Sequence, residues 1–181
     1  TGRYYAWTDG GAVLQAALSR RSSPRKGTPY FDKPAEWLAD PSSHPICSPR
    51  IAFREVTNRL NARTLIAALI PAERVTTQTA PWVLWIDETE KETREAFLLG
   101  ILASRICDWW LRRFVDRHVD EEAFFSIRVP RFDPLSSRVR RVVALAGRLA
   151  ARDQRYAAWA TAVGVDCGPL DDHVKEEMTA E

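Results

Sequence analysis

The sequence is poor in glycine and cysteine, and each shortage excludes a class of protein. Only 8 of the 181 residues are glycine and no two of them stand two positions apart, which excludes dinucleotide fingerprints and Gly-rich phosphate loops. The cysteines, Cys47, Cys107 and Cys167, lie about sixty residues apart, which does not match the disulfide framework of a small secreted scaffold. We therefore expect a cytoplasmic protein in a reducing environment.

Signals for membrane insertion and for catalysis are also missing. No apolar run approaches the roughly 20 residues that a membrane-spanning helix needs, so we expect no membrane partner. There is no G-x-S-x-G motif, and His44 and Cys47 form only one half of a metal site. The acidic clusters at 87–92 and 116–122 are more typical of charged helix ends than of an active site. We expect no catalysis, no cofactor and no metal on this chain, and because it lacks an initiator Met we interpret it as a fragment of a larger protein.

Positive charge comes almost entirely from arginine and is unevenly distributed. Of the 26 basic residues 4 are lysine, and arginine is the side chain best suited to bidentate contact with phosphate or guanine. Residues 1–165 carry a formal charge of +7, whereas residues 166–181 carry −5. A polyanionic partner is one explanation of this pattern, and the compositional bias of a GC-rich genome is the other.

Hydrophobic periodicity predicts an α+β fold in which a small mixed β-sheet packs against two long helices. The expected extended segments are 51–56, 64–70, 82–86 and a short run at 124–129. The expected helices are 10–20, 93–119 and 137–161, with one short helical turn at 34–39. The resulting organisation is an N-terminal helix and irregular arm (1–47), an α+β domain (48–161) and an acidic C-terminal tail (162–181).

The segment 50–71 concentrates side chains that suit nucleic acid on and between two apolar strands. Its candidate DNA-binding residues are Arg50, Arg54, Asn58, Arg59, Asn61 and Arg63. Arginine pairs with guanine and asparagine with adenine in a major groove, and both also bind phosphates. The alternative is a loop between strands that internal pairs of arginine with carboxylate hold in place. The residues by themselves leave the two interpretations equally open.

The same segment resembles a signature in the C-terminal half of DNA adenine methyltransferases of the type IIG restriction-modification kind and their phage-defence relatives. The likeness begins with an Arg-Ile-Ala-Phe-Arg strand at 50–54, an Asn-x-Arg-Thr turn at 61–64 and an apolar strand that ends at Pro71. It continues through the Leu-Leu-Gly-Ile-Leu run at 98–102 and the Asp-Trp pair that begins at Asp108. The aromatic pair Phe124-Phe125, the Val129-Pro130 end of the following segment and the final helix also resemble the family, so that the similarity spans about residues 48–150.

The resemblance implies a target-recognition domain, which reads double-stranded DNA and presents the target adenine to a catalytic methyltransferase domain in cis. The parent enzyme of such a family uses S-adenosylmethionine and carries an Asn-Pro-Pro-Tyr type motif, which this chain lacks. The acidic residues Asp120, Glu121 and Glu122 depart from the family pattern, and they would repel phosphate. The chain alone would then bind DNA without catalysing methyl transfer.

A protein-interaction module is the alternative function from another class. In that case the arginine-rich last helix and the acidic tail would dock a partner subunit, and the aromatic residues of the arm at 30–39 would fill a groove. Salt-sensitive DNA binding would separate the two functions.

Overall fold

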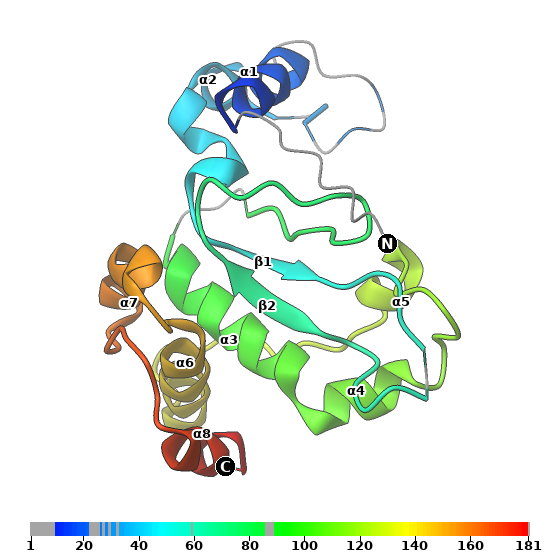
Figure 1. The fold of residues 1–181 in the computed structure, drawn as a ribbon, viewed down its shortest axis with the longest axis vertical. Helices are drawn as coiled ribbons and strands as arrows, with labels where there is room; N and C mark the ends of the chain where they lie inside the picture. Colours follow the sequence, from blue (N-terminus) through cyan, green and yellow to red (C-terminus); the bar gives the residue numbers. More distant parts are fainter. Residues whose placement is uncertain are drawn as a thin grey trace, which may run out of the picture. The chain divides into compact units, whose positions relative to one another are not determined.

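The computed structural model describes residues 10–21, 26, 28, 30, 31, 33–58, 60–85 and 89–180, and they form two compact units. The first unit consists of Thr1–Ser48 and Ala72–Val75, and the second consists of Pro49–Pro71 and Thr76–Glu181. Figure 1 shows the elements of both. The described residues confirm the predicted α+β class, with eight α-helices and one small sheet. Among them, no helix combines the length and the apolar character that a membrane crossing requires.

The first unit is organised around the buried side chain of Arg21, the last residue of helix α1 (Gly10–Arg21). Its guanidinium lies 4.3 Å above the centre of the Trp37 ring in the short helix α2 (Ala35–Ala39). It also donates hydrogen bonds to the carbonyls of Trp37 and Asp40 and to the Ser43 hydroxyl. Two 3-10 turns, η1 (Pro41–Ser43) and η2 (Pro45–Cys47), follow α2. The helix and the helical turn predicted for this region are confirmed.

The sheet of the second unit is antiparallel and has two strands among the described residues, so the prediction of a mixed sheet is wrong. Strand β1 (Arg50–Phe53) pairs with β2 (Ala67–Ile70), and Arg50 lies opposite Ile70. The strand predicted at 82–86 reduces to one bridge between Ala52 and Trp82. Around this bridge the amide of Phe53 donates to the carbonyl of Pro81 and the amide of Val83 donates to the carbonyl of Ile51, both at 2.9 Å. Ile86 lies outside the described residues.

The helix predicted at 93–119 is two helices, α3 (Lys91–Ala103) and α4 (Arg105–Leu111), and residues 112–119 are not helical. Ser104 separates them, because its backbone is extended and its hydroxyl accepts a hydrogen bond from the amide of Cys107 at 3.1 Å. Serine favours this capping position because its side chain replaces a helical partner that the first turn lacks. After the break, α4 brings Asp108 within hydrogen-bond distance of the chain that leads into β2, where the amide of Thr64 donates to it.

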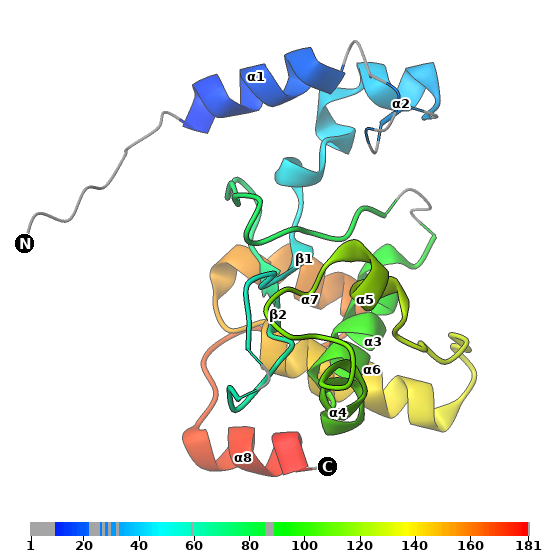
Figure 2. The ribbon, with the colours of Figure 1, turned by 90° about the vertical axis from the view of Figure 1, so that its right-hand side faces the viewer.

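The helix predicted at 137–161 ends early, and α6 (Ser137–Ala150), the 3-10 turn η3 (Gln154–Tyr156) and α7 (Ala157–Val163) replace it. Asp153 caps η3 by accepting the amide of Arg155 at 3.0 Å, and this turn reverses the chain. Figure 2 shows α6 beside α3. Their close approach depends on Gly100, because a Cβ at this position would stand 2.6 Å from Cγ1 of Val142.

The extended run predicted at 124–129 is also wrong in its first half, where helix α5 (Glu121–Phe125) forms. Asp120 caps this helix by accepting the amide of Ala123 at 2.8 Å, and Glu121 and Glu122 occupy its first turn. An aspartate followed by two glutamates is a signal for a helix start, so the sequence itself indicates a helix at this position. Phe124 packs flat on Phe53 of β1, with ring centres 4.3 Å apart.

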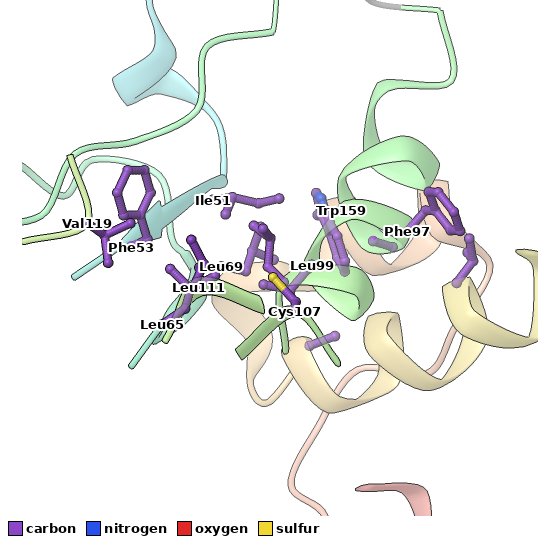
Figure 3. Packing of buried hydrophobic residues seen from close by; sticks show 14 of the residues in the cluster. Ile51, Phe53, Leu65, Leu69, Phe97, Leu99, Cys107, Leu111, Val119 and Trp159 are labelled. Carbon is purple, nitrogen blue, oxygen red and sulfur yellow. The ribbon is translucent and has the colours of Figure 1, made fainter. Parts of the chain in front are cut away.

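The core of the second unit lies where the two strands meet α3, α4 and α7. Figure 3 shows the side chains of Ile51, Leu69, Leu99 and Leu111 gathered between strands and helices. Trp159 of α7 is 3% exposed and belongs to the same cluster. The turn after α6 therefore contributes to the fold by bringing this indole into the core. Burial of such side chains stabilises a domain by about 2 kcal/mol each.

The acidic tail has two parts. Residues 165–169 are anchored, since Arg148 donates to the carbonyls of Gly168 and Pro169 and the amide of Gly168 donates to Ala151. Helix α8 (Asp172–Ala180) follows beside α6, and its residues 172–176 are exposed.

Candidate nucleic-acid interface

The loop that joins β1 to β2 is closed at its neck by buried hydrogen bonds. The hydroxyl of Thr57 donates to the carbonyl of Thr64 at 2.6 Å, and the amide of Thr57 donates to the carbonyl of Arg117 at 2.8 Å. Arg54 adds a hydrogen bond from Nη2 to the same Thr57 hydroxyl at 3.2 Å. The described residues of the loop beyond this point, 58 and 60–63, therefore begin from a fixed neck.

Asp108 of α4 holds the returning half of this loop. Its Oδ1 accepts the backbone amides of Thr64 at 2.7 Å and Leu65 at 3.1 Å, and its Oδ2 accepts Nε of Arg112 at 2.8 Å. The carboxylate belongs to a residue that is 6% exposed. Burial raises the pKa of Asp108, but the hydrogen bonds from Arg112, Leu65 and Thr64 and the charge of Arg112 outweigh it, so the pKa lies below its usual value. Asp108 thus stays ionised and acts as a brace for the loop.

Two arginines complete the brace. Arg112 donates from Nη2 to the carbonyls of Asn61 and Ala62, both at 2.7 Å. Arg63 donates from Nη2 to the carbonyls of Ala103 at 2.5 Å and Ser104 at 3.2 Å, and its Nε lies 3.8 Å from the Asp108 carboxylate. One of the two interpretations of the sequence was that pairs of arginine with carboxylate hold this loop in place, and the contacts of Arg63 agree with it.

The two asparagines lie exposed on the braced loop. Oδ1 of Asn58 accepts the amide of Leu60 at 2.8 Å. The amide oxygen of Asn61, in the orientation that its neighbours require, accepts Nη2 of Arg54 at 3.0 Å and the amide of Asn58 at 3.2 Å. Neither Nδ2 group forms a hydrogen bond with another residue in the described part of the chain. The loop therefore presents amide donors, while the oxygens fix their orientation.

The remaining candidates differ in accessibility. Arg50 is 4% exposed and its guanidinium lies 5.8 Å from the centre of the Trp82 ring. Arg54 is half-buried and serves the loop as described above. Arg59 lies outside the described residues. The structure thus brings Arg54, Asn58, Asn61 and Arg63 together at one loop and places Arg50 apart, inside the sheet.

The sequence analysis missed Asp108 and Arg112 as partners of this loop. Their spacing of four residues on a helix is a recognisable signal for a side-chain pair, but it gives no information about a loop 44 positions earlier in the chain. Only the packing of α4 against the strands reveals that contact.

Other chemistry is sparse in the described residues. No group of three or more histidine, cysteine, aspartate or glutamate side chains is arranged to hold a metal ion among them. All three cysteines are free, and burial raises the pKa of the Cys107 thiol to about 11. Comparison with known proteins identifies no relative, since no family model, no curated protein and no solved structure matches the chain.

Proposed function

We propose that the chain is a DNA-binding target-recognition domain, a C-terminal part of a larger S-adenosylmethionine-dependent DNA adenine methyltransferase or restriction-modification enzyme of the phage-defence kind. It binds double-stranded DNA and works with a catalytic domain in cis. The domain has no catalytic role of its own, and the cofactor belongs to the parent enzyme. The motifs at 50–71 and 98–112 that resemble this family support the assignment.

The observation that carries the proposal is the braced polar loop, of which the structure describes residues 58 and 60–63. A binding loop gains affinity when it is fixed before the partner arrives, because less conformational entropy is lost on binding. Asp108 and Arg112 fix this loop from within, and the exposed Nδ2 groups of Asn58 and Asn61 are donors that suit phosphate oxygens and the acceptors of base edges.

The loop geometry also refines the expected mode of recognition. A bidentate contact with adenine needs both an amide donor and an amide oxygen from the same asparagine. The oxygen of Asn61 already accepts two hydrogen bonds, so this side chain can only donate. We therefore expect Asn61 to contact a phosphate or a base acceptor, and not to recognise adenine in the bidentate mode.

A titration of the 181-residue chain with labelled duplex DNA of random sequence tests the proposal. Affinity should fall as salt rises from about 50 to about 200 mM, since each neutralised phosphate releases condensed counterions. The double variant Asn58→Ala/Asn61→Ala should bind several-fold more weakly at both salt concentrations. Arg59→Ala should reduce the slope of log affinity against log salt by about one if this arginine contacts a phosphate.

Gln154→Ala provides a matched control, because it removes an exposed side-chain amide from η3 instead of from the loop. It should bind as the unmodified chain does. Duplex binding that is absent at about 50 mM salt, or that is insensitive to salt, would contradict the proposal and favour the protein-interaction module. In the arm, Trp37 already packs on Arg21, which leaves Phe31, 44% exposed, as an aromatic contact for such a partner.

A further inference from the structure

The side of α4 that faces away from the loop is exposed and combines apolar with cationic side chains. We define the α4 outer face as Arg105, Ile106 and Trp109 of α4 together with Arg113, which lies two residues beyond the end of the helix. Ile106 is 79% exposed and Trp109 is 57% exposed, and both arginines are exposed as well. Large apolar side chains with this much exposure are uncommon next to one another on a folded domain, and they mark a site of interaction.

The helix period explains why one short helix has two different sides. Asp108 and Arg112 stand four positions apart and face the loop, whereas Trp109 and Arg113, one position later, face solvent. The guanidinium of Arg113 lies 4.4 Å from the centre of the Trp109 ring. A cation at this distance interacts favourably with an indole and also keeps its own charge close to the ring.

The positive charge of Arg105 and Arg113 favours a partner that carries negative charge. In the part of the chain that the structure describes, neither Arg105 nor Arg113 forms an ion pair. Trp109 has Arg113 next to its ring and Arg105 four positions earlier in the sequence, and an aromatic ring accompanied by cations suits the alternation of base and phosphate in a nucleic-acid strand. An apolar partner without negative charge would leave both guanidinium groups uncompensated.

Phe125 shows that exposure alone does not give this match. Its ring is 74% exposed, but it belongs to α5, whose first turn carries Glu121 and Glu122. These carboxylates repel phosphate, so a strand has no electrostatic reason to bind there. The cationic surroundings of Trp109 therefore suit a nucleotide better than the acidic surroundings of Phe125.

We propose that the α4 outer face is a stacking platform for an unpaired nucleotide, with the base on the Trp109 ring and the adjacent phosphates at Arg105 and Arg113. The platform rests on the proposed function for its place in the molecule, because Arg112 connects α4 directly to the loop that we assign to duplex DNA. DNA bound at the loop would bring a displaced or unstacked base within reach of α4. The substrate class is thus single-stranded DNA, or duplex DNA with an unpaired base.

Fluorescence anisotropy with labelled (dT)12 tests this platform on the full chain. Trp109→Ala should weaken binding about 10-fold, because stacking of a base on an aromatic ring contributes strongly to single-strand affinity. Trp109→Phe keeps a ring and should lose less than about 3-fold, which a role limited to packing would not predict. Phe125→Ala is the matched control and should change binding by less than about 2-fold. Circular dichroism of each variant checks that the fold is retained.

Two further probes separate this inference from the proposed function. A fully paired duplex should be insensitive to Trp109→Ala, whereas the same duplex with one unpaired thymine should bind the variant more weakly. If Asn58→Ala/Asn61→Ala impairs duplex binding while Trp109→Ala behaves as Phe125→Ala on every probe, the platform is wrong and the proposed function stands. If (dT)12 binding depends on Trp109 but the duplex does not bind, the platform stands and the proposed function is wrong. Absence of binding to every oligonucleotide, with self-association that Trp109→Ala abolishes in sedimentation velocity, would assign the face to a second copy of the chain.

Discussion

Asp108 in α4 and Glu95 in α3 are both buried carboxylates, yet their surroundings move their pKa values in opposite directions. Asp108 accepts two backbone amides and a guanidinium, and its pKa is lowered. Glu95 is fully buried, and burial raises its pKa to about 7 although the indole of Trp159 donates to Oε2 at 3.0 Å. Its other oxygen, Oε1, has no hydrogen-bond partner among the described residues.

The contrast shows that the supply of donors, and not burial by itself, decides whether a buried carboxylate supports the fold. Three donors compensate Asp108 for the water that it loses. One indole donor does not compensate Glu95, which becomes a source of instability once it ionises. Where α4 meets the loop, the ionised carboxylate of Asp108 therefore supports the fold. Where α3 meets α7, the fold is more stable when the carboxyl group of Glu95 is neutral.

Removal of the brace should produce the largest effect. Asp108→Ala leaves the amides of Thr64 and Leu65 and the guanidinium of Arg112 without their acceptor, so we expect a loss of about 3 to 5 kcal/mol in the free energy of unfolding. Asp108→Asn keeps an oxygen for the two amides and should lose less. Urea denaturation measures both, and equal stability of Asp108→Ala and the unmodified chain would rule out the brace.

Replacement of Glu95 should increase the free energy of unfolding, in contrast to the loss expected for Asp108→Ala. The folded pKa of Glu95, about 7, lies above its ordinary value of 4.5, so its protonated form stabilises the fold below pH 4.5 and this contribution disappears as the pH rises towards 7. Glu95→Gln should therefore be more stable than the unmodified chain by about 3 kcal/mol at pH 8 and similar to it at pH 4. Denaturation at both pH values measures the difference.

The pH range distinguishes the two carboxylates. Because the folded pKa of Asp108 lies below 3.8, its contribution is present above that pH and is lost as the pH falls through the folded pKa. A profile of Glu95→Gln that still loses stability between pH 4.5 and 7 would show that another group is responsible for that loss.

The two arginines that follow α4, Arg112 and Arg113, should differ in their contribution to stability, and both effects should be smaller than that of Asp108→Ala. Arg112→Ala removes a donor to Asp108 and to two loop carbonyls, and we expect it to reduce stability by about 1 to 2 kcal/mol. Arg113→Ala removes an exposed guanidinium and should change stability by less than about 0.5 kcal/mol. Thermal denaturation of the pair measures this, and equal losses would mean that α4 has no distinct inner and outer sides.

Deletion of 171–181 should have a smaller effect than Arg112→Ala, because residues 172–176 of α8 are exposed and neither buried carboxylate depends on them. We expect a change of less than about 1 kcal/mol, with the pH dependence from Glu95 unaltered. Deletion from residue 165 should be more harmful, since it also removes the carbonyls that Arg148 binds. Comparison of the two truncations by circular dichroism locates the end of the folded unit.

Much of the fold follows from local patterns in the sequence. Strand β2 lies within its predicted range and β1 overlaps its own, starting one residue earlier, and α1, α2 and the start of α6 are where apolar spacing and capping residues place them. The two long predicted helices fail for a similar reason, since the periodic apolar pattern continues across a break in the helix. Ser104 caps α4 directly after α3 ends, Asp153 caps η3 after α6 has ended at Ala150, and Asp120 caps a helix that extends into the run predicted to be extended at 124–129.

The candidate site was predictable in composition but not in arrangement. Local sequence is enough to show that arginines and asparagines cluster between two strands and that helix spacing puts Asp108 beside Arg112. The hydrogen bonds from Arg63 to carbonyls 40 and 41 positions away, and the contact of Glu95 with Trp159 at a separation of 64, arise from tertiary packing. Periodicity and capping act over a few neighbouring residues, whereas exposure and pKa depend on groups that packing brings together from distant parts of the chain.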